Sequence, residues 1–259
     1  MNIPILNIDS FQIIDIAKRA GNVIMEIYNK DFDFYMKSDN SPLTEADLTS
    51  NKVIVEGLKE LTPHFPILSE ESSKEEIKGR MSWETYWLID PLDGTKEFIK
   101  KNDEFTVNIA LVHKNKTVFG VVDAPALKLT YWGGKDVGSC KLKNDIESSI
   151  TVTNKKNCSK DIKIVGSRSH QSQEFLDFIV DYPGAKIVSM GSSLKLCLVA
   201  EGSADIYPRF GLTSEWDTAA AQAIVEGAGG SIVSLMNNKP LKYNTNKNTL
   251  LNPHFLASN

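Results

Sequence analysis

The chain has 259 residues, of which 41% are hydrophobic and 24% charged, so it can bury a large core as a water-soluble globular protein. Its formal net charge of -4 argues against binding to a nucleic acid polymer, which needs a basic surface. A phosphorylated substrate would therefore have to be bound at a locally positive site, formed by metal ions or by a few Lys and Arg side chains. The three cysteines lack CxxC spacing, a pattern typical of reduced thiols in the cytoplasm.

The sequence predicts no targeting or membrane-spanning segment. Residues 1–9 lack a basic stretch and their apolar residues are interrupted, which is not typical of a signal peptide. No apolar run approaches the length of a membrane-spanning helix. We therefore expect a cytoplasmic protein. Peripheral contact with the inner face of a membrane and the choice between a monomer and a homodimer stay open.

Two amphipathic helices are predicted near the start of the chain. Ser10 can cap the first, in which apolar residues recur at helical spacing up to about Tyr28. Residues 41–44 open the second helix, Leu48 is expected on its apolar side, and Thr62-Pro63 ends it.

The next stretch combines a short strand with acidic residues. Residues 65–69 predict a strand that runs into Glu70 and Glu71. The charged segment 73–80 is then expected to be a solvated loop or lid.

A buried strand that ends in acid organises the middle of the chain. Residues 86–89 form an apolar run suited to a strand covered on both faces. Asp90 follows at the carboxyl end of this strand, where α/β proteins place ligands. Because Pro91 cannot continue a central ladder, we expect the chain to turn there and to aim Asp90 and Asp93 at one point.

The residues after this turn favour an anion. Gly94 permits a close backbone approach, and Thr95 can cap a short helix over 96–99. The free N–H groups and the dipole of such a helix attract a phosphate. One turn therefore offers two carboxylates and the Leu92 carbonyl to a hard cation, with phosphate donors beside them.

The rest of the chain predicts an antiparallel region and then an α/β region. Strands are expected over 105–113, 118–124 and 128–132, with one or two more before 157. The remainder is expected to alternate strands (162–165, 186–189, 205–207 and a closing strand 231–235) with helices (173–180, 193–200 and 217–226). This pattern predicts helices layered on sheets in one catalytic unit of two lobes, about 1–150 and about 151–259.

Further acids have ordinary structural explanations when each is taken alone. Asp47 follows Thr44 by three residues, as in a capping box, and Asp217 lies at a helix start, where acids suit the dipole. Glu70 and Glu71 point opposite ways on an extended segment, so at most one faces a shared site. If several of these acids converge, their repulsion is costly unless cations compensate. An all-oxygen donor set favours Mg²⁺ or Mn²⁺ over Zn²⁺.

The order of these motifs resembles the inositol monophosphatase superfamily of lithium-sensitive, Mg²⁺-dependent phosphatases. The resemblance is carried by Asp47, Glu70-Glu71, Asp90-Pro91-Leu92-Asp93-Gly94-Thr95, Trp216-Asp217 and, eleven residues later, Gly229-Gly230. It implies an α+β fold in the form of a layered αβαβα sandwich.

Other strings are similar to the CysQ-type 3'(2'),5'-bisphosphate nucleotidases of that superfamily. They lie at 93–98, 104–111, 167–170, 191–195 and 207–211, and Lys96-Glu97 stands where inositol monophosphatases typically carry Thr-Asn. The implied reaction removes the 3'-phosphate of adenosine 3',5'-bisphosphate to give AMP and phosphate. The sulfated nucleotide is implied as a further substrate, which would link the enzyme to sulfate assimilation.

The resemblance also implies the metal ligands. Glu70, Asp90 and the Leu92 carbonyl would hold the ion that activates water, and Asp90, Asp93 and Asp217 would hold an ion near the leaving oxygen. A third, weaker ion would sit against Glu70. Mg²⁺ is the implied ion, Mn²⁺ is a substitute and Li⁺ is inhibitory.

The remaining implied roles concern catalysis and the substrate. Thr95 and Asp47 would mainly orient the water, because a Thr hydroxyl is a poor base. The N–H groups of Gly94 and Thr95 would bind the scissile phosphate. The rest of the nucleotide would contact Ser167, His170, Gly191 and Lys195, with Arg209 as a weaker candidate. Taken alone, Lys195 could equally be a solvated helix lysine and His170 a loop histidine without a role.

Two alternatives stay open at this point. A phosphatase of the same fold could act on inositol monophosphate or a sugar bisphosphate, but Lys195 and the string 167–170 favour a nucleotide, because a small cyclitol has no distal phosphate to bind. A catalytically inactive binder of nucleotide or metal is disfavoured, because all the carboxylates and Thr95 are present.

Overall fold

The computed structural model describes residues 2–3, 8–30, 32–36, 42–154, 161–166 and 172–259. Within these ranges, no helix combines the length and the apolar character needed to cross a bilayer.

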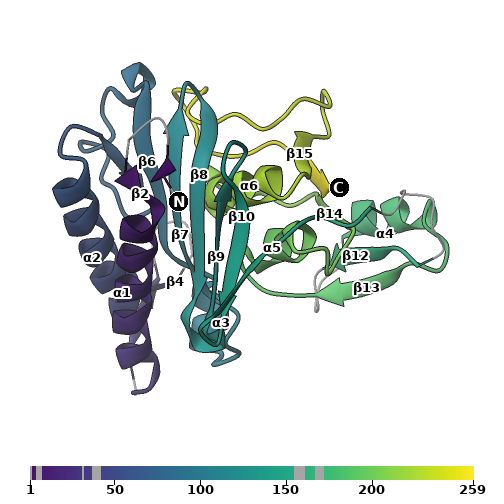
Figure 1. The fold of residues 1–259 in the computed structure, drawn as a ribbon, viewed down its shortest axis with the longest axis horizontal. Coiled ribbons are helices and arrows are strands. Elements are labelled where there is room, and N and C mark those ends of the chain that lie inside the picture. Colours follow the sequence, from purple (N-terminus) through teal and green to yellow (C-terminus); the bar gives the residue numbers. More distant parts are fainter. Residues whose placement is uncertain (1, 4–7, 31, 37–41, 155–160, 167–171) are drawn as a thin grey trace.

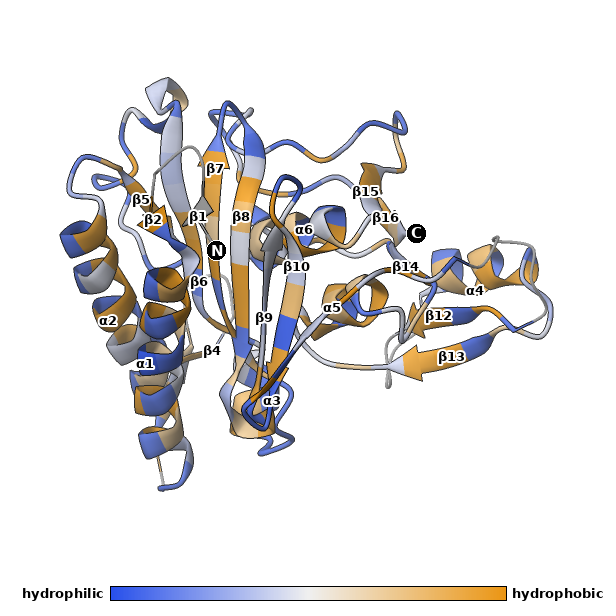
Figure 2. Ribbon diagram, viewed as in Figure 1, coloured by the Kyte–Doolittle hydropathy of each residue, from blue (hydrophilic) through white to orange (hydrophobic). Residues whose placement is uncertain are grey.

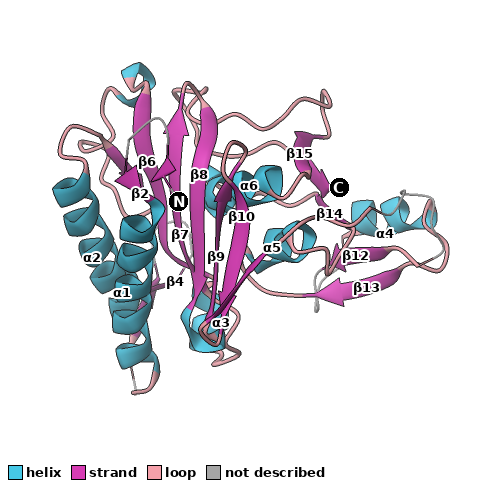
Figure 3. Ribbon diagram, viewed as in Figure 1, coloured by secondary structure: helices cyan, strands magenta, loops and turns pink. Residues whose placement is uncertain are grey.

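Helices and sheets stack in five layers (Figure 1). Helices α1 (Ser10–Tyr28) and α2 (Glu45–Leu61) cover one face of a seven-stranded sheet. Helices α5 (Leu194–Ala200) and α6 (Glu215–Gly227) lie between this sheet and a five-stranded sheet, and α4 (Gln173–Val180) covers the outer face of the latter. The expected αβαβα sandwich is confirmed, and Figure 3 shows the alternation of helical and strand layers.

The seven-stranded sheet has the order β11-β10-β9-β8-β7-β6-β5 and is antiparallel except for the parallel pair β5 and β6. Its strands are β5 (Ile67–Ser69), β6 (Thr85–Asp93), β7 (Thr106–His113), β8 (Lys116–Ala124), β9 (Leu129–Gly134), β10 (Gly138–Lys143) and β11 (Ile146–Ser149). A short 3-10 helix, Pro125–Leu127, links β8 to β9.

Both faces of this sheet are buried, which explains the apolar run in the sequence of β6. Trp87 and Ile89 belong to the core beneath α1 and α2, whereas Tyr86 and Leu88 belong to the core around α5 and α6. A strand covered on both sides needs apolar residues at every position. Figure 2 shows hydrophobic residues along the central strands and hydrophobic and hydrophilic residues in turn along α1 and α2.

The five-stranded sheet has the order β13-β12-β14-β16-β15, with parallel pairing among the first three strands and antiparallel pairing among the last three. Its strands are β12 (Lys163–Gly166), β13 (Lys186–Ser189), β14 (Ile206–Arg209), β15 (Ser231–Ser234) and β16 (Phe255–Ser258). The prediction that 231–235 closes the fold was wrong, because β16 follows it and pairs with both β14 and β15.

The starts of the first two helices differ from the prediction. Asp9, not Ser10, caps α1 by accepting the Phe11 N–H at 3.2 Å. Residues Pro42–Thr44 form strand β4, which pairs with β3 (Phe34–Met36), and α2 begins only at Glu45. Leu48 is 52% exposed rather than packed on the apolar side. A second small sheet pairs β1 (Asn2–Ile3) with β2 (Ile8–Asp9).

The charged segment before β6 is only partly solvated. It ends in a 3-10 helix, Arg80–Ser82, and the Arg80 side chain is buried with 6% exposure. The prediction of a solvated loop over 73–80 was therefore wrong at Arg80, because its guanidinium donates a hydrogen bond to the Asn246 carbonyl in a loop distant in sequence.

Candidate active site

Strand β6 delivers the central acids through a bulge. Asp90 pairs with Asn108 and Asp93 pairs with Thr106, so the register with β7 shifts between the two acids. Pro91 has no N–H to donate, and a bulge tolerates this loss, so the strand continues through it. The prediction that the chain turns at Pro91 was wrong for this reason.

The turn after β6 starts helix α3 (Thr95–Ile99). Gly94 is its N-cap with φ of 88°, and a Cβ there would lie 3.1 Å from the Glu104 carbonyl oxygen, so glycine is required. Thr95 is the first helical residue and does not cap, contrary to expectation. Its Oγ1 lies 3.2 Å from Asp47 Oδ1 and 3.3 Å from the Leu92 carbonyl oxygen.

Asp47 serves the helix start and the site at once. Its Oδ2 accepts the N–H and the hydroxyl of Thr44, at 2.7 and 2.6 Å, which completes a capping box on α2. Its Oδ1 accepts the Thr95 hydroxyl. The two explanations considered from the sequence are therefore compatible, because each uses a different oxygen.

Backbone N–H groups at the starts of two helices in the second half of the chain orient the carboxylates of Asp93 and Asp217. Asp217 Oδ2 accepts the Ser214 N–H at 2.8 Å within the capping box of α6. Asp93 Oδ2 accepts the Ser193 N–H at 2.5 Å, from the N-cap of α5. Both acids line one cavity of about 150 Å³, which Lys195 and Arg209 also line.

The predicted metal ligands act on one another electrostatically. Burial raises the pKa of Asp90 well above its usual range, and the charges of Glu70, Asp93 and Asp217 raise it further. Loss of hydration raises the pKa of Asp93 to about 6, against the lowering effect of Lys195. The pKa of Asp217 rises to about 8 through loss of hydration and the Asp93 charge. The Glu70 charge contributes to the raised pKa values of all three acids.

The donor chemistry fits a hard divalent cation. The donors are carboxylate oxygens whose ionised forms are disfavoured by burial and by one another, and a cation relieves both costs. Yet in the described part of the chain no three His, Cys, Asp or Glu side chains gather into a metal-binding group. Repulsion between charges extends over longer distances than a metal–oxygen bond of about 2 Å, so the carboxylates are neighbours rather than a closed ligand set.

A larger pocket of about 670 Å³ adjoins the small cavity. Four residues line both, namely Glu97, Lys195, Tyr207 and Arg209. The larger pocket also has apolar and aromatic walls, from Phe175, Met190 and Phe210, and two more lysines, Lys96 and Lys100. Through these shared residues the two hollows form one cleft, with Asp93 and Asp217 at the smaller hollow and Glu97 and Glu104 among the walls of the larger one.

The predicted substrate residues fall into two groups. Lys195 lines both hollows and donates to the Ser192 carbonyl at 3.1 Å. Gly191 lines the larger pocket, where a Cβ would lie 2.8 Å from Glu104. Ser167 and His170 lie outside the described residues.

Sequence reasoning missed the hydrogen bonds that fix Asp93. Ser193 donates its N–H to Asp93, and its hydroxyl lies 2.8 Å from both Asn108 Oδ1 and Thr106 Oγ1. These contacts join the start of α5 to strand β7 beneath the acids. The quoted strings 104–111 and 191–195 contain all three partners, but their pairing across the fold is not visible in either string.

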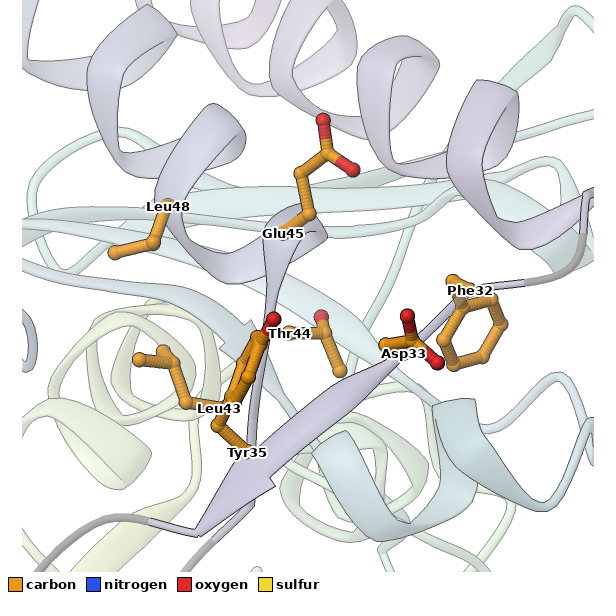
Figure 4. A pocket seen from close by; sticks show the side chains of 7 residues that line it. All are labelled: Phe32, Asp33, Tyr35, Leu43, Thr44, Glu45 and Leu48. Atoms are coloured by element: carbon orange, nitrogen blue, oxygen red, sulfur yellow. The ribbon is translucent and has the colours of Figure 1, made fainter.

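A separate hollow of about 550 Å³ lies beside the β3–β4 pair (Figure 4). Thr44 lies at its centre, and Phe32, Tyr35 and Leu43 are among its walls. Among the described residues that line it, none is a predicted metal, catalytic or substrate residue. Of the predicted acids, Asp93 and Asp217 line the cleft that contains Lys195, whereas Asp47, Glu70 and Asp90 are not among its lining residues.

The layered fold and its acid-lined cleft define a class of phosphatases with carboxylate metal sites. The profile of the inositol monophosphatase family matches residues 7–259, and the chain belongs to this family, as its motifs indicated. Phosphatases of the family are metal-dependent.

The individual relatives include proteins named CysQ. The chain is 44% identical over 246 residues to the 3'(2'),5'-bisphosphate nucleotidase CysQ of Salmonella typhimurium, covering 94% of this chain and 97% of the relative. It is 43% identical over 249 residues to CysQ of Escherichia coli K12, covering 95% and 98%. The crystal structure of CysQ from Bacteroides thetaiotaomicron superposes with a TM-score of 0.82 at 40% identity over 96% of both chains.

Proposed function

We propose that this chain is a Mg²⁺-dependent 3'(2'),5'-bisphosphate nucleotidase that converts adenosine 3',5'-bisphosphate to AMP and inorganic phosphate. The observation that carries the proposal is the continuous cleft, in which Lys195 and Arg209 line both the acid-lined cavity and the larger pocket. A substrate with two phosphates on one nucleoside matches a cleft that combines carboxylates able to bind cations with several cationic side chains, namely Lys96, Lys100, Lys195 and Arg209. CysQ relatives with 43–44% identity over nearly the whole chain support the same activity. The sulfated nucleotide is a second substrate in this proposal.

The proposed metal ligands are Glu70, Asp90, Asp93, Asp217 and the Leu92 carbonyl, for two or three Mg²⁺ ions, with Mn²⁺ able to replace them. When bound, the ions would lower the pKa of a water molecule and stabilise charge on the phosphate oxygens. The protein's own part is to orient the acids, and backbone hydrogen bonds offset part of the rise in the pKa values of Asp93 and Asp217. The N–H of Ser193 fixes the Asp93 carboxylate and that of Ser214 fixes the Asp217 carboxylate.

Thr95 and Asp47 are proposed to orient the attacking water. Asp47 Oδ1 is the nearer acceptor for the Thr95 hydroxyl, at 3.2 Å against 3.3 Å for the Leu92 carbonyl, and a carboxylate is the stronger acceptor. With its proton directed at Asp47, the Thr95 oxygen presents lone pairs that can accept a hydrogen bond from water. The pair therefore sets the direction of the water rather than removing its proton.

The substrate is proposed to lie along the cleft. The N–H groups of Gly94 and Thr95 would bind the scissile 3'-phosphate beside the acids. Lys195 would bind the 5'-phosphate, with Arg209 as a second cation. Gly191 leaves room for close contact with the nucleotide, and Ser167 and His170 are proposed as further contacts. The aromatic walls of the larger pocket suit a nucleobase.

The residues of the cleft and the pair Thr95 and Asp47 also argue against the alternative functions. Inositol monophosphate has no distal phosphate for Lys195, and a regulator without activity has no need for the ordered pair Thr95 and Asp47.

We further propose a cytoplasmic enzyme in which about 1–150 and about 151–259 act as two lobes. The free, buried thiols of Cys140 and Cys197 suit a reducing compartment.

The test is a comparison of substrates. Phosphate release is measured with Mg²⁺ from adenosine 3',5'-bisphosphate, inositol 1-phosphate and fructose 1,6-bisphosphate. We expect a clear preference for the nucleotide, loss of activity with a chelator and inhibition by Li⁺. A preference for either of the other substrates would contradict the nucleotidase proposal.

A further inference from the structure

An arginine is buried where the charged segment before β6 ends. The Arg80 guanidinium donates to the side-chain oxygen of Asn244, to the Asn246 carbonyl at 2.6 Å and to the Thr249 carbonyl at 3.4 Å. Only 6% of Arg80 is exposed. A buried charge is costly unless its partners are held in place, so this arginine ties segment 70–80 firmly to the loop that follows β15.

Asn244 links Arg80 to helix α6. Its side-chain nitrogen donates to the Arg80 carbonyl at 2.6 Å, so the two residues exchange hydrogen bonds in both directions. Its backbone N–H donates to Glu215 Oε2 at 2.7 Å. Asn244 is 2% exposed and Glu215 3%. Arg80, Asn244 and Glu215 therefore form a continuous buried brace.

The two ends of the brace belong to the two segments of the chain that carry the proposed metal ligands Glu70 and Asp217. Glu70 begins the segment that Arg80 ends, and the Glu70 N–H is held by the Ile89 carbonyl at 3.2 Å. Glu215 lies two residues before Asp217 in the first turn of α6, and its N–H donates to the Leu250 carbonyl at 2.7 Å. Glu70 and Asp217 come from different layers of the fold, and the brace connects those layers.

We propose that Arg80, Asn244 and Glu215 are positioning residues that hold Glu70 and Asp217 at the spacing needed for metal binding. The inference rests on the proposed metal site but not on the identity of the substrate. Partners that orient metal ligands typically change metal affinity by about 10- to 100-fold when they are removed. A merely structural brace would change thermal stability and leave metal affinity unaltered.

The test is Mn²⁺ binding to the full chain without substrate, followed by electron paramagnetic resonance. Arg80→Lys keeps the charge and loses the guanidinium fork, and Asn244→Gly removes the amide at a residue whose φ of 55° glycine accepts. Glu215→Met keeps the length of the side chain and removes the acceptor of the Asn244 N–H. The control is Asp205→Asn, at a buried acid that accepts from Thr153 and Lys163 and lies outside the brace.

We expect the brace variants to bind Mn²⁺ at least about tenfold more weakly, with a nucleotide KM near that of the wild type. Asp205→Asn is expected to lower Tm while binding Mn²⁺ normally. Folded brace variants with dissociation constants within twofold of the wild type, or an equal weakening in Asp205→Asn, would overturn the proposal. If Arg80→Lys or Asn244→Gly does not fold, Glu215→Met decides by the same criterion. Because no substrate is present, the result is independent of which phosphate ester the enzyme hydrolyses.

Discussion

The two ends of the cleft are built in different ways. At the acid end, Asp90, Asp93 and Asp217 each accept a hydrogen bond from a backbone N–H. At the other end, the pocket is wide, and Lys96 and Lys100 line it from α3 and its C-cap, whereas Lys195 from α5 and Arg209 from β14 line both ends. The difference is that backbone N–H groups orient the acids proposed as metal ligands, whereas the proposed substrate contacts are side chains from separate elements.

Removing a charge at the acid end should have the largest effect. Asp93→Asn is expected to lower kcat by about a thousandfold, because a neutral amide is a weaker ligand for a cation. Burial raises the pKa of Asp93 to about 6, so its charge is costly in the metal-free protein, and the variant should keep or raise Tm. Turnover and thermal unfolding with a chelator check both parts. A folded variant with wild-type turnover would remove Asp93 from the metal site.

Removing the Thr95 hydroxyl should have the next largest effect. Thr95→Ala is expected to lower kcat by about a hundredfold with little change in nucleotide KM, because the water loses its orienting partner. Thr95→Ser is the matched control, since it keeps the hydroxyl. Steady-state kinetics at saturating Mg²⁺ measure both variants. Equal rates for the Ala and Ser variants would exclude the proposed role of the hydroxyl.

A buried acid outside the cleft sharpens the comparison. Asp123 is 4% exposed and accepts the Thr130 hydroxyl at 2.7 Å, and burial raises its pKa from 3.8 to about 6. A raised pKa means that the folded protein binds the proton more tightly than the unfolded chain. Stability is therefore lost as pH rises from about 4 to about 6, and Asp123→Asn removes this loss.

The expected size of this effect is about 1–3 kcal/mol, since one pKa unit corresponds to about 1.4 kcal/mol. The free energy of unfolding of Asp123→Asn minus that of the wild type should therefore be larger at pH 7.5 than at pH 4.5. Urea unfolding with a chelator at the two pH values measures the difference. Because Asp123 is not among the residues that line the cleft, the stability difference between the variant and the wild type should be the same with and without Mg²⁺. An equal stability difference at both pH values would contradict the assigned cause.

The sequence predicted most where a contiguous motif determines the geometry. The string from Asp90 to Thr95 indicated a cation beside a phosphate, and the layered fold was confirmed. Its local course was less predictable, because a bulge let β6 continue through Pro91. A single string shows residue types but not the partner strand that permits a bulge.

The sequence predicted least where distant segments meet. Arg80 looked solvated because its neighbours are charged, yet its acceptors lie more than 160 residues away. Ser193 and Asn108 are likewise joined only in the folded chain. Strand β16 depends on two flanking strands for its pairing, so its four residues carry little signal alone.

One measurement tests most directly whether the two ends of the cleft act on one nucleotide. It compares kcat/KM for adenosine 3',5'-bisphosphate and for adenosine 3'-phosphate in the wild type and in Lys195→Met. The account predicts that the wild type prefers the bisphosphate by at least roughly tenfold, the range for a hydrogen bond to a charged group, and that Lys195→Met loses most of this preference. Equal rates on both substrates in the wild type, or an undiminished preference in Lys195→Met, would contradict it.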